Sequence, residues 1–168
     1  MRLLGAVLAG GQSRRFGSDK AVALWSGRTL LDHAIELLTA QASDVVVCGR
    51  AWPGGIALHD YPSPGLGPLG GLGAALRYAE ANGYDALITT GCDLLDVPRD
   101  FAARLSPGPA AALGQPLLGV WPAGLSTLLD AHVAQGHRSM MSWIAATKAQ
   151  IVDLGPVRNV NTPADLLD

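Results

Sequence analysis

The residue types best suited to chemistry first gather near the start of the chain, in the stretch Leu8-Ala9-Gly10-Gly11-Gln12-Ser13-Arg14-Arg15-Phe16-Gly17-Ser18-Asp19-Lys20. Its two adjacent glycines let the backbone turn and approach a ligand closely, and bare amides in such a turn can donate to phosphate oxygens. Arg14, Arg15 and Lys20 add three positive charges, and the only other lysine of the chain is Lys148. This combination favours a phosphate-binding loop over a glycine-rich turn with ordinary surface charges.

Two aspartates follow predicted strands farther along the chain. Asp93 comes directly after the apolar run that ends in Thr89-Thr90-Gly91-Cys92, where a carboxylate can hold Mg²⁺ that bridges phosphate oxygens. A turn or helix-capping aspartate is the alternative. Asp60 opens a long loop rich in Pro and Gly, and its residue type is common in turns, so on pattern alone its role stays open.

The elements that must position these residues alternate between strands and helices. The apolar run Leu3–Leu8 predicts a buried parallel strand that leads into the glycines. Apolar spacing predicts helices over Thr29–Ala40 and Leu69–Ala81. This alternation predicts a three-layer α/β/α fold with a mostly parallel sheet, in which ligands bind outside the carboxyl ends of the strands. The other expected strands are 44–48, 56–59, 85–90, 110–113, 116–120 and 150–154, and the other expected helices are 98–105, 124–134, 139–146 and one starting at 161–163.

Composition limits the class of protein. The chain has 168 residues, 49% of them hydrophobic and 15% charged, which predicts one ordered domain over residues 1–168. A net charge of −2 offers no basic surface for nucleic acid, no apolar stretch is long enough to span a membrane, and Met1-Arg2 leads straight into the first strand without a signal peptide. Cys48 and Cys92 have no metal-ligand spacing and do not suggest a disulfide scaffold, so we expect a cytoplasmic protein.

Two nucleotide-binding patterns are excluded. Gly65-Leu66-Gly67-Pro68-Leu69-Gly70 fits G-x-G-x-x-G, but it lies several residues after a later strand and contains a proline, whereas the dinucleotide pattern directly follows a first strand. No acidic residue ends a following strand at the usual distance of about 20 residues. The sequence G-x-x-x-x-G-K-[ST] of P-loop NTPases does not occur.

The stretch from Leu8 to Lys20 resembles the L-A-G-G-x-S-x-R-x-G-x-D-K loop of the molybdenum cofactor guanylyltransferases, which belong to the wider class of nucleotidyltransferases. The resemblance implies a Rossmann-like nucleotidyltransferase fold, with this loop around the triphosphate of GTP. It also implies that Asp93 is the Mg²⁺ ligand, and that Asp60 and the turn Gly67-Pro68-Leu69-Gly70-Gly71 contact the nucleotide. The residues it assigns to cofactor or substrate binding are Leu8, Ala9, Gly10, Gly11, Arg15, Lys20, Asp60, Gly67, Asp93, Arg138, Asn159 and Asn161, with Lys20, Arg14 and Asp93 as the catalytic group.

The C-terminal part of the chain continues the resemblance. Asn159-Val160-Asn161-Thr162-Pro163-Ala164-Asp165-Leu166 is similar to the family's N-V-N-T-P-x-D/E-L motif, and His137-Arg138-Ser139 is similar to a segment near the acceptor pocket. By themselves, the first stretch indicates a helix cap and the second a helix start. The chain departs from the family in two places. It lacks the proline of C-D-x-P after Cys92-Asp93, and Cys48 stands where some members have a nucleotide-binding asparagine.

The resulting hypothesis is an Mg²⁺-dependent transfer of GMP from GTP to molybdenum-molybdopterin, with release of pyrophosphate. The resemblance also implies transient contact with molybdoenzymes or their chaperones. Two alternatives stay open: transfer from CTP or GTP to another phosphorylated acceptor, and a nucleotide-binding accessory protein without turnover. No pattern in the chain identifies the base, the acceptor or the oligomeric state.

Overall fold

A central sheet organises the computed structural model, which describes residues 1–11, 17 and 19–167. Within these residues, seven strands pair in the order β10-β8-β9-β6-β1-β4-β5, and only β9 runs antiparallel to its neighbours. The predicted mostly parallel sheet is therefore confirmed. The strands are β1 (Leu3–Leu8), β4 (Asp44–Cys48), β5 (Ile56–Leu58), β6 (Ala86–Gly91), β8 (Ala110–Ala112), β9 (Gln115–Pro122) and β10 (Gln150–Val152).

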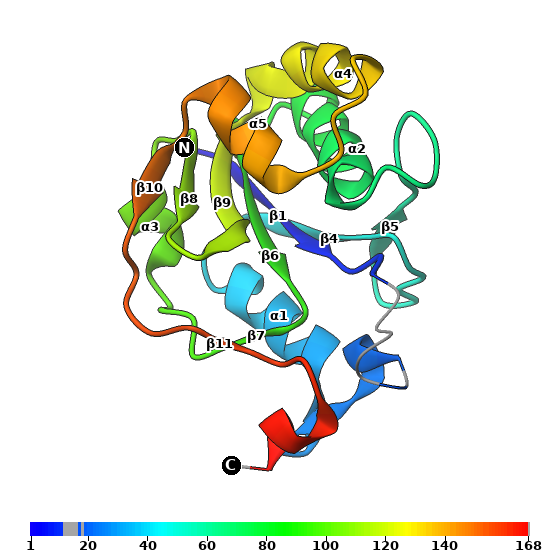
Figure 1. Cartoon of the computed structure of the whole chain (residues 1–168), viewed down its shortest axis with the longest axis vertical. Helices are drawn as coiled ribbons and strands as arrows, with labels where there is room; N and C mark the ends of the chain where they lie inside the picture. The colour runs from blue at the N-terminus through cyan, green and yellow to red at the C-terminus, as the bar shows by residue number, and fades with distance from the viewer. Residues whose placement is uncertain (12–16, 18, 168) are drawn as a thin grey trace.

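Helices cover both faces of this sheet, so the three-layer α/β/α prediction is also confirmed. Helices α2 (Pro68–Ala81), α4 (Ser126–Ala134) and α5 (Met140–Thr147) lie on one face, and α1 (Leu30–Thr39) and α3 (Phe101–Leu105) lie on the other (Figure 1). Among the described residues, no helix has the length and apolar character that crossing a membrane requires.

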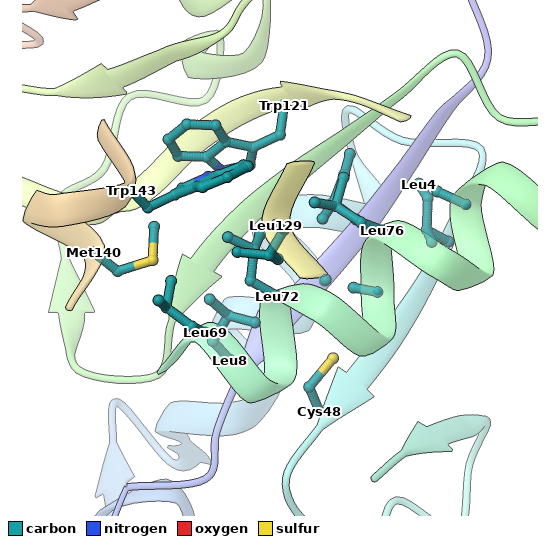
Figure 2. Close-up of a cluster of buried hydrophobic side chains, with 14 of the residues drawn as sticks. Leu4, Leu8, Cys48, Leu69, Leu72, Leu76, Trp121, Leu129, Met140 and Trp143 are labelled. Atoms are coloured by element: carbon teal, nitrogen blue, oxygen red, sulfur yellow. The ribbon is translucent and has the colours of Figure 1, made fainter. Parts of the chain in front are cut away.

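The larger apolar cluster packs α2, α4 and α5 onto the sheet. Leu69, Leu72 and Leu76 of α2 lie over the sheet, and the rings of Trp121 and Trp143 pack together at one end with centroids 6.1 Å apart (Figure 2). The Trp121 indole also donates to the Thr89 hydroxyl at 3.1 Å, which satisfies a buried polar group on β6. This packing places the start of α2 beside the carboxyl ends of β1 and β4, where Gly71 lies against Leu8 and Cys48.

Local capping sets several element boundaries. The Thr29 hydroxyl accepts from the Asp32 amide at 3.0 Å and begins α1, and Pro68 occupies the first turn of α2. The predicted helix start at Pro98 is wrong, because the chain makes a turn from Pro98 to Phe101 and α3 begins only at Phe101. In the part of the chain that the structure describes, three short 3₁₀ segments complete the helices: η1 (Lys20–Val22), η2 (Ala123–Leu125) and η3 (Pro163–Leu166). The helix expected from Gly124 therefore begins as η2 and becomes α-helical at Ser126, and the terminal helix is the 3₁₀ segment η3.

Two small antiparallel ladders were not expected from the sequence. Strands β2 (Leu24–Trp25) and β3 (Arg28–Thr29) form a hairpin before α1. Strands β7 (Leu94–Leu95) and β11 (Arg158–Asn159) join segments more than sixty residues apart (Figure 1). The second ladder brings the C-terminal motif next to Asp93.

Candidate active site

A cavity of about 570 Å³ lies at the carboxyl ends of the central parallel strands. The register aligns Leu8 at the end of β1 with Cys48 of β4 on one side and Gly91 of β6 on the other. All three strands therefore end at one edge, where an α/β sheet binds its ligands. The cavity is lined by Leu8, Ala9, Gly10, Gly11, Asp19, Lys20, Ala21, Cys48, Asp60, Gly65, Gly67, Pro68, Gly71, Cys92, Asp93 and Leu117.

Most residues predicted from the sequence line this cavity together. They are Leu8, Ala9, Gly10, Gly11, Lys20, Asp60, Gly67 and Asp93. Arg14 and Arg15 lie outside the described residues. The binding roles of all these residues stay predictions.

Asp93 is half-buried, and a glycine makes room for its carboxylate. A Cβ atom added at Gly91 would lie 2.7 Å from Asp93 Oδ1, so the side chain folds back over the end of β6. The Asp93 carbonyl accepts from the Val160 amide at 2.7 Å, which fixes the backbone. Within the described part of the chain, no three His, Cys, Asp or Glu side chains converge as a metal cluster. A single carboxylate in a cavity wall fits Mg²⁺, because this ion is usually held by one or two carboxylates and completes its coordination with substrate phosphates and water.

Asp60 sits against the first turn of α2. A Cβ atom at Gly70 would lie 2.7 Å from Asp60 Cγ and Oδ2, so the close approach depends on this glycine. Burial raises the pKa of the Asp60 carboxyl, and the nearby His59 lowers it by a smaller amount. Asp60 therefore lines the cavity as a partly desolvated carboxylate. A ligand that donates hydrogen bonds to it would stabilise its charged form.

The two cysteines at the cavity are poor nucleophiles. Burial raises the pKa of the Cys48 thiol to about 12, with a smaller contribution from Asp60. Burial also raises the pKa of the Cys92 thiol to about 12, with Asp93 adding to the effect. Both thiols are protonated at neutral pH, and the thiolate is the reactive form. Covalent catalysis by either cysteine is therefore disfavoured.

The residues predicted for the acceptor side lie outside the cavity lining. The Asn159 amide oxygen accepts from Gln115 Nε2 at 2.5 Å, and β11 holds Asn159 opposite Leu94, next to Asp93. Arg138 donates to the carbonyls of Val133 and His137 at 3.0 and 2.8 Å, so its guanidinium is engaged at the end of α4. Its own carbonyl would lie 3.2 Å from a Cβ atom at Gly67, so its backbone borders the cavity.

The backbone N–H of Asn161 donates to Asp165 Oδ2 at 2.7 Å, and Thr162 and Asp165 form a capping box at η3. This bears out the cap expected from the pattern alone. The asparagine itself remains exposed.

Sequence reasoning missed one charged group beside the cavity. Arg50 follows β4 by two residues and makes an ion pair with Asp19, which precedes Lys20. The Arg50 guanidinium lowers the pKa of the Asp19 carboxyl. No motif links the two residues, which are 31 positions apart in sequence and meet only in the folded chain.

A glycine-lined cavity at the carboxyl edge of a mostly parallel sheet, with a lysine and an aspartate in its wall, is the arrangement of nucleotide-binding α/β proteins. A family model described as the MobA-like NTP transferase domain matches residues 5–151. The chain belongs to this family.

Similar proteins agree with this assignment. The chain is 34% identical to a molybdenum cofactor guanylyltransferase of Acidiphilium cryptum, over 98% of this chain and 92% of that protein. It is 35% identical to one of Cereibacter sphaeroides, over 99% and 94%. The crystal structure of molybdopterin-guanine dinucleotide biosynthesis protein A from Archaeoglobus fulgidus superposes with a TM-score of 0.71 at 19% identity, over 99% of this chain and 95% of that chain. The last likeness shows the nucleotidyltransferase fold alone.

Proposed function

We propose that this protein transfers GMP from GTP to molybdenum-molybdopterin and releases pyrophosphate. The observation that carries the proposal is the single cavity that gathers Gly10, Gly11, Lys20 and Asp93 at the ends of β1 and β6. The whole-length similarity to proteins named molybdenum cofactor guanylyltransferase supplies the substrates. Transfer from CTP, or to a different phosphorylated acceptor, has no observation in its favour.

In this reaction, an oxygen of the acceptor's terminal phosphate attacks the α-phosphorus of GTP. The bond from that phosphorus to the bridging oxygen breaks, and pyrophosphate leaves with the electron pair. The attacking phosphate is already anionic, so the reaction needs no side-chain nucleophile, in keeping with the protonated Cys48 and Cys92. Catalysis then consists of positioning and charge stabilisation.

Each part of the cavity wall has a separate task. Backbone amides of Gly10 and Gly11 and the Lys20 ammonium hold the triphosphate, and Arg14 and Arg15 would add charge. Asp93 would hold Mg²⁺, which would neutralise charge on the phosphate oxygens when bound.

The base and the acceptor lie on opposite sides of the phosphates. Asp60 and the turn at Gly67 receive the base and ribose. On the acceptor side, Asn159 and Asn161 lie on the segment held against Asp93. We assign the protein to the reducing cytoplasm, because Cys48 and Cys92 are free thiols.

The test is pyrophosphate release by the purified protein with Mg²⁺, molybdopterin and each of GTP, CTP and ATP. We expect turnover with GTP, and kcat/KM for GTP at least tenfold above that for CTP. Asp93→Asn keeps the size of the side chain but loses the charge, and turnover should vanish at saturating Mg²⁺. Asp100→Asn is the matched control, because Asp100 is exposed and lies outside the cavity. An active Asp93→Asn protein would remove the metal assignment. Nucleotide binding without any turnover would favour an accessory protein.

A further inference from the structure

Arg50 and Asp19 form a two-pronged ion pair at the rim of the cavity. Arg50 Nη1 donates to Asp19 Oδ1 at 2.8 Å, and Nη2 donates to Oδ2 at 2.6 Å. A planar guanidinium that makes two parallel hydrogen bonds fixes the carboxylate in direction as well as distance. The residues are 31 positions apart in sequence, so the pair ties two separate segments together.

Asp19 also caps the short helix that carries Lys20. Its Oδ1 accepts from the Ala21 amide at 3.2 Å, and η1 begins at Lys20. The carboxylate therefore links the Arg50 guanidinium to the first turn of η1. Lys20 and Ala21, like Asp19, line the cavity, whereas Arg50 does not.

Gly49, the residue before Arg50, contacts the backbone near the start of the stretch from Leu8 to Lys20. Gly49 has φ +89°, and a Cβ atom there would lie 2.6 Å from Gly10 Cα and 2.8 Å from Gly10 N. The Ala9 amide adds a hydrogen bond to the Cys48 carbonyl at 2.9 Å. Two consecutive residues after β4, Gly49 and Arg50, thus hold the beginning and the end of the stretch that the sequence predicts to bind phosphate.

We propose that Arg50 is a positioning residue that acts through Asp19 to set the location of Lys20 in the cavity wall that also contains Asp93. The pair is partly exposed, with 22% of the Arg50 side chain and 49% of the Asp19 side chain accessible. Ion pairs this exposed add little to stability. We therefore expect the Arg50–Asp19 pair to affect the geometry of the predicted phosphate site more than the stability of the fold. Small misplacements of a catalytic group strongly slow a reaction. The kinetic part of this inference rests on the proposed function.

The first experiment compares Arg50→Gln and Asp19→Asn with the parent in steady-state GTP transfer. We expect kcat/KM for GTP to fall about 10- to 100-fold in each variant, with KM for the acceptor within twofold of the parent. The melting temperature should stay within about 4 °C. Arg28→Gln is the matched control, because it breaks the Arg28–Glu36 pair on the surface away from the cavity and should leave kcat/KM unchanged. Parental kinetics in Arg50→Gln would overturn the proposal.

Two further variants separate positioning from charge alone. Arg50→Lys keeps the charge but cannot make the two-pronged contact, so we expect it to restore less than a third of the lost kcat/KM. The double variant Arg50→Gln/Asp19→Asn should be no slower than the slower single variant, because both changes remove the same link. Full activity of Arg50→Lys, or multiplicative losses in the double variant, would show that the two residues do not act as a pair.

A readout without turnover separates this inference from the proposed function. Amide hydrogen exchange of the segment from Lys20 to Ala23 should be at least fivefold faster in Arg50→Gln than in Arg28→Gln. If the parent protein fails to use GTP but this exchange difference appears, the proposed function fails and the structural link stands. If GTP is used and the exchange is unchanged, Arg50 has no positioning role.

Discussion

Replacing Gly49 by alanine tests the backbone contact between Gly49 and Gly10 at the cavity. Gly49 follows β4 and carries a positive φ of +89°. An added Cβ atom would lie 2.6 Å from Gly10 Cα and 2.8 Å from Gly10 N, and both neighbours are backbone atoms that cannot rotate away. The substitution therefore strains the residue itself and pushes the end of β1 out of place.

The expected cost is the sum of two terms. Placing an alanine in the left-handed region costs roughly 1–2 kcal/mol, and forcing a backbone shift costs roughly 1–3 kcal/mol more. Gly155 provides the matched control, because its φ is +85° and nothing lies within 4 Å of an added Cβ atom. We expect Gly155→Ala to carry only the cost of the left-handed backbone. Gly49→Ala should therefore be about 1–3 kcal/mol less stable than Gly155→Ala.

Urea unfolding at 25 °C with linear extrapolation measures both free energies of unfolding. The KM for GTP should also rise in Gly49→Ala, because the contact displaces Gly10 in the cavity wall, and it should stay at the parental value in Gly155→Ala. Equal free energies of unfolding for the two variants would refute the claim that the backbone at Gly49, just after β4, approaches Gly10 through a contact that only glycine allows.

Three other predictions concern charges and thiols at the cavity. Lys20→Ala should slow single-turnover GMP transfer by roughly 10²–10³-fold, the usual cost of removing one preorganised charge stabiliser; an unchanged rate would place Lys20 outside the site. Burial raises the pKa of the Asp60 carboxyl in the folded protein above its value in the unfolded chain. The free energy of unfolding therefore falls as pH rises from the unfolded-state pKa through the folded-state pKa. Asp60→Asn should therefore unfold at a higher urea concentration than the parent at pH 7, with the difference disappearing below pH 4, while nucleotide affinity falls. Cys48 and Cys92, with thiol pKa values raised to about 12, should react with iodoacetamide at pH 8 at least tenfold more slowly in the folded protein than in urea, as mass spectrometry can measure.

The elements with the clearest apolar patterns were predictable from the sequence. Asp44–Cys48 is a strand with the predicted bounds, because a β-branched run between polar residues favours a buried strand. The direction of β9 was not predictable, since residues 116–120 are equally apolar whichever way the strand runs. The hairpin of β2 and β3 escaped notice because each strand has only two residues and no periodicity can develop.

The candidate site was predictable where backbone chemistry dominates. Gly10 and Gly11 carry the signal directly in their residue type, whereas Gly67 was assigned only through the resemblance to the family, and all three line the cavity. The Arg50–Asp19 pair left no comparable signal, because two ordinary surface residues form it and only the folded chain brings them together.

The departure from the family after Cys92-Asp93 has a structural consequence at this same edge. Where the family often has a proline, this chain has Leu95, which is buried with Leu30 and Val160. Its strand β7 pairs with β11, and the Val160 amide donates to the Asp93 carbonyl. Apolar packing and backbone pairing therefore hold the C-terminal asparagines beside Asp93 without the proline. The predicted acceptor side therefore lies next to the predicted metal ligand even though this proline is absent. A transfer between two phosphates requires the acceptor and the metal ligand to be neighbours.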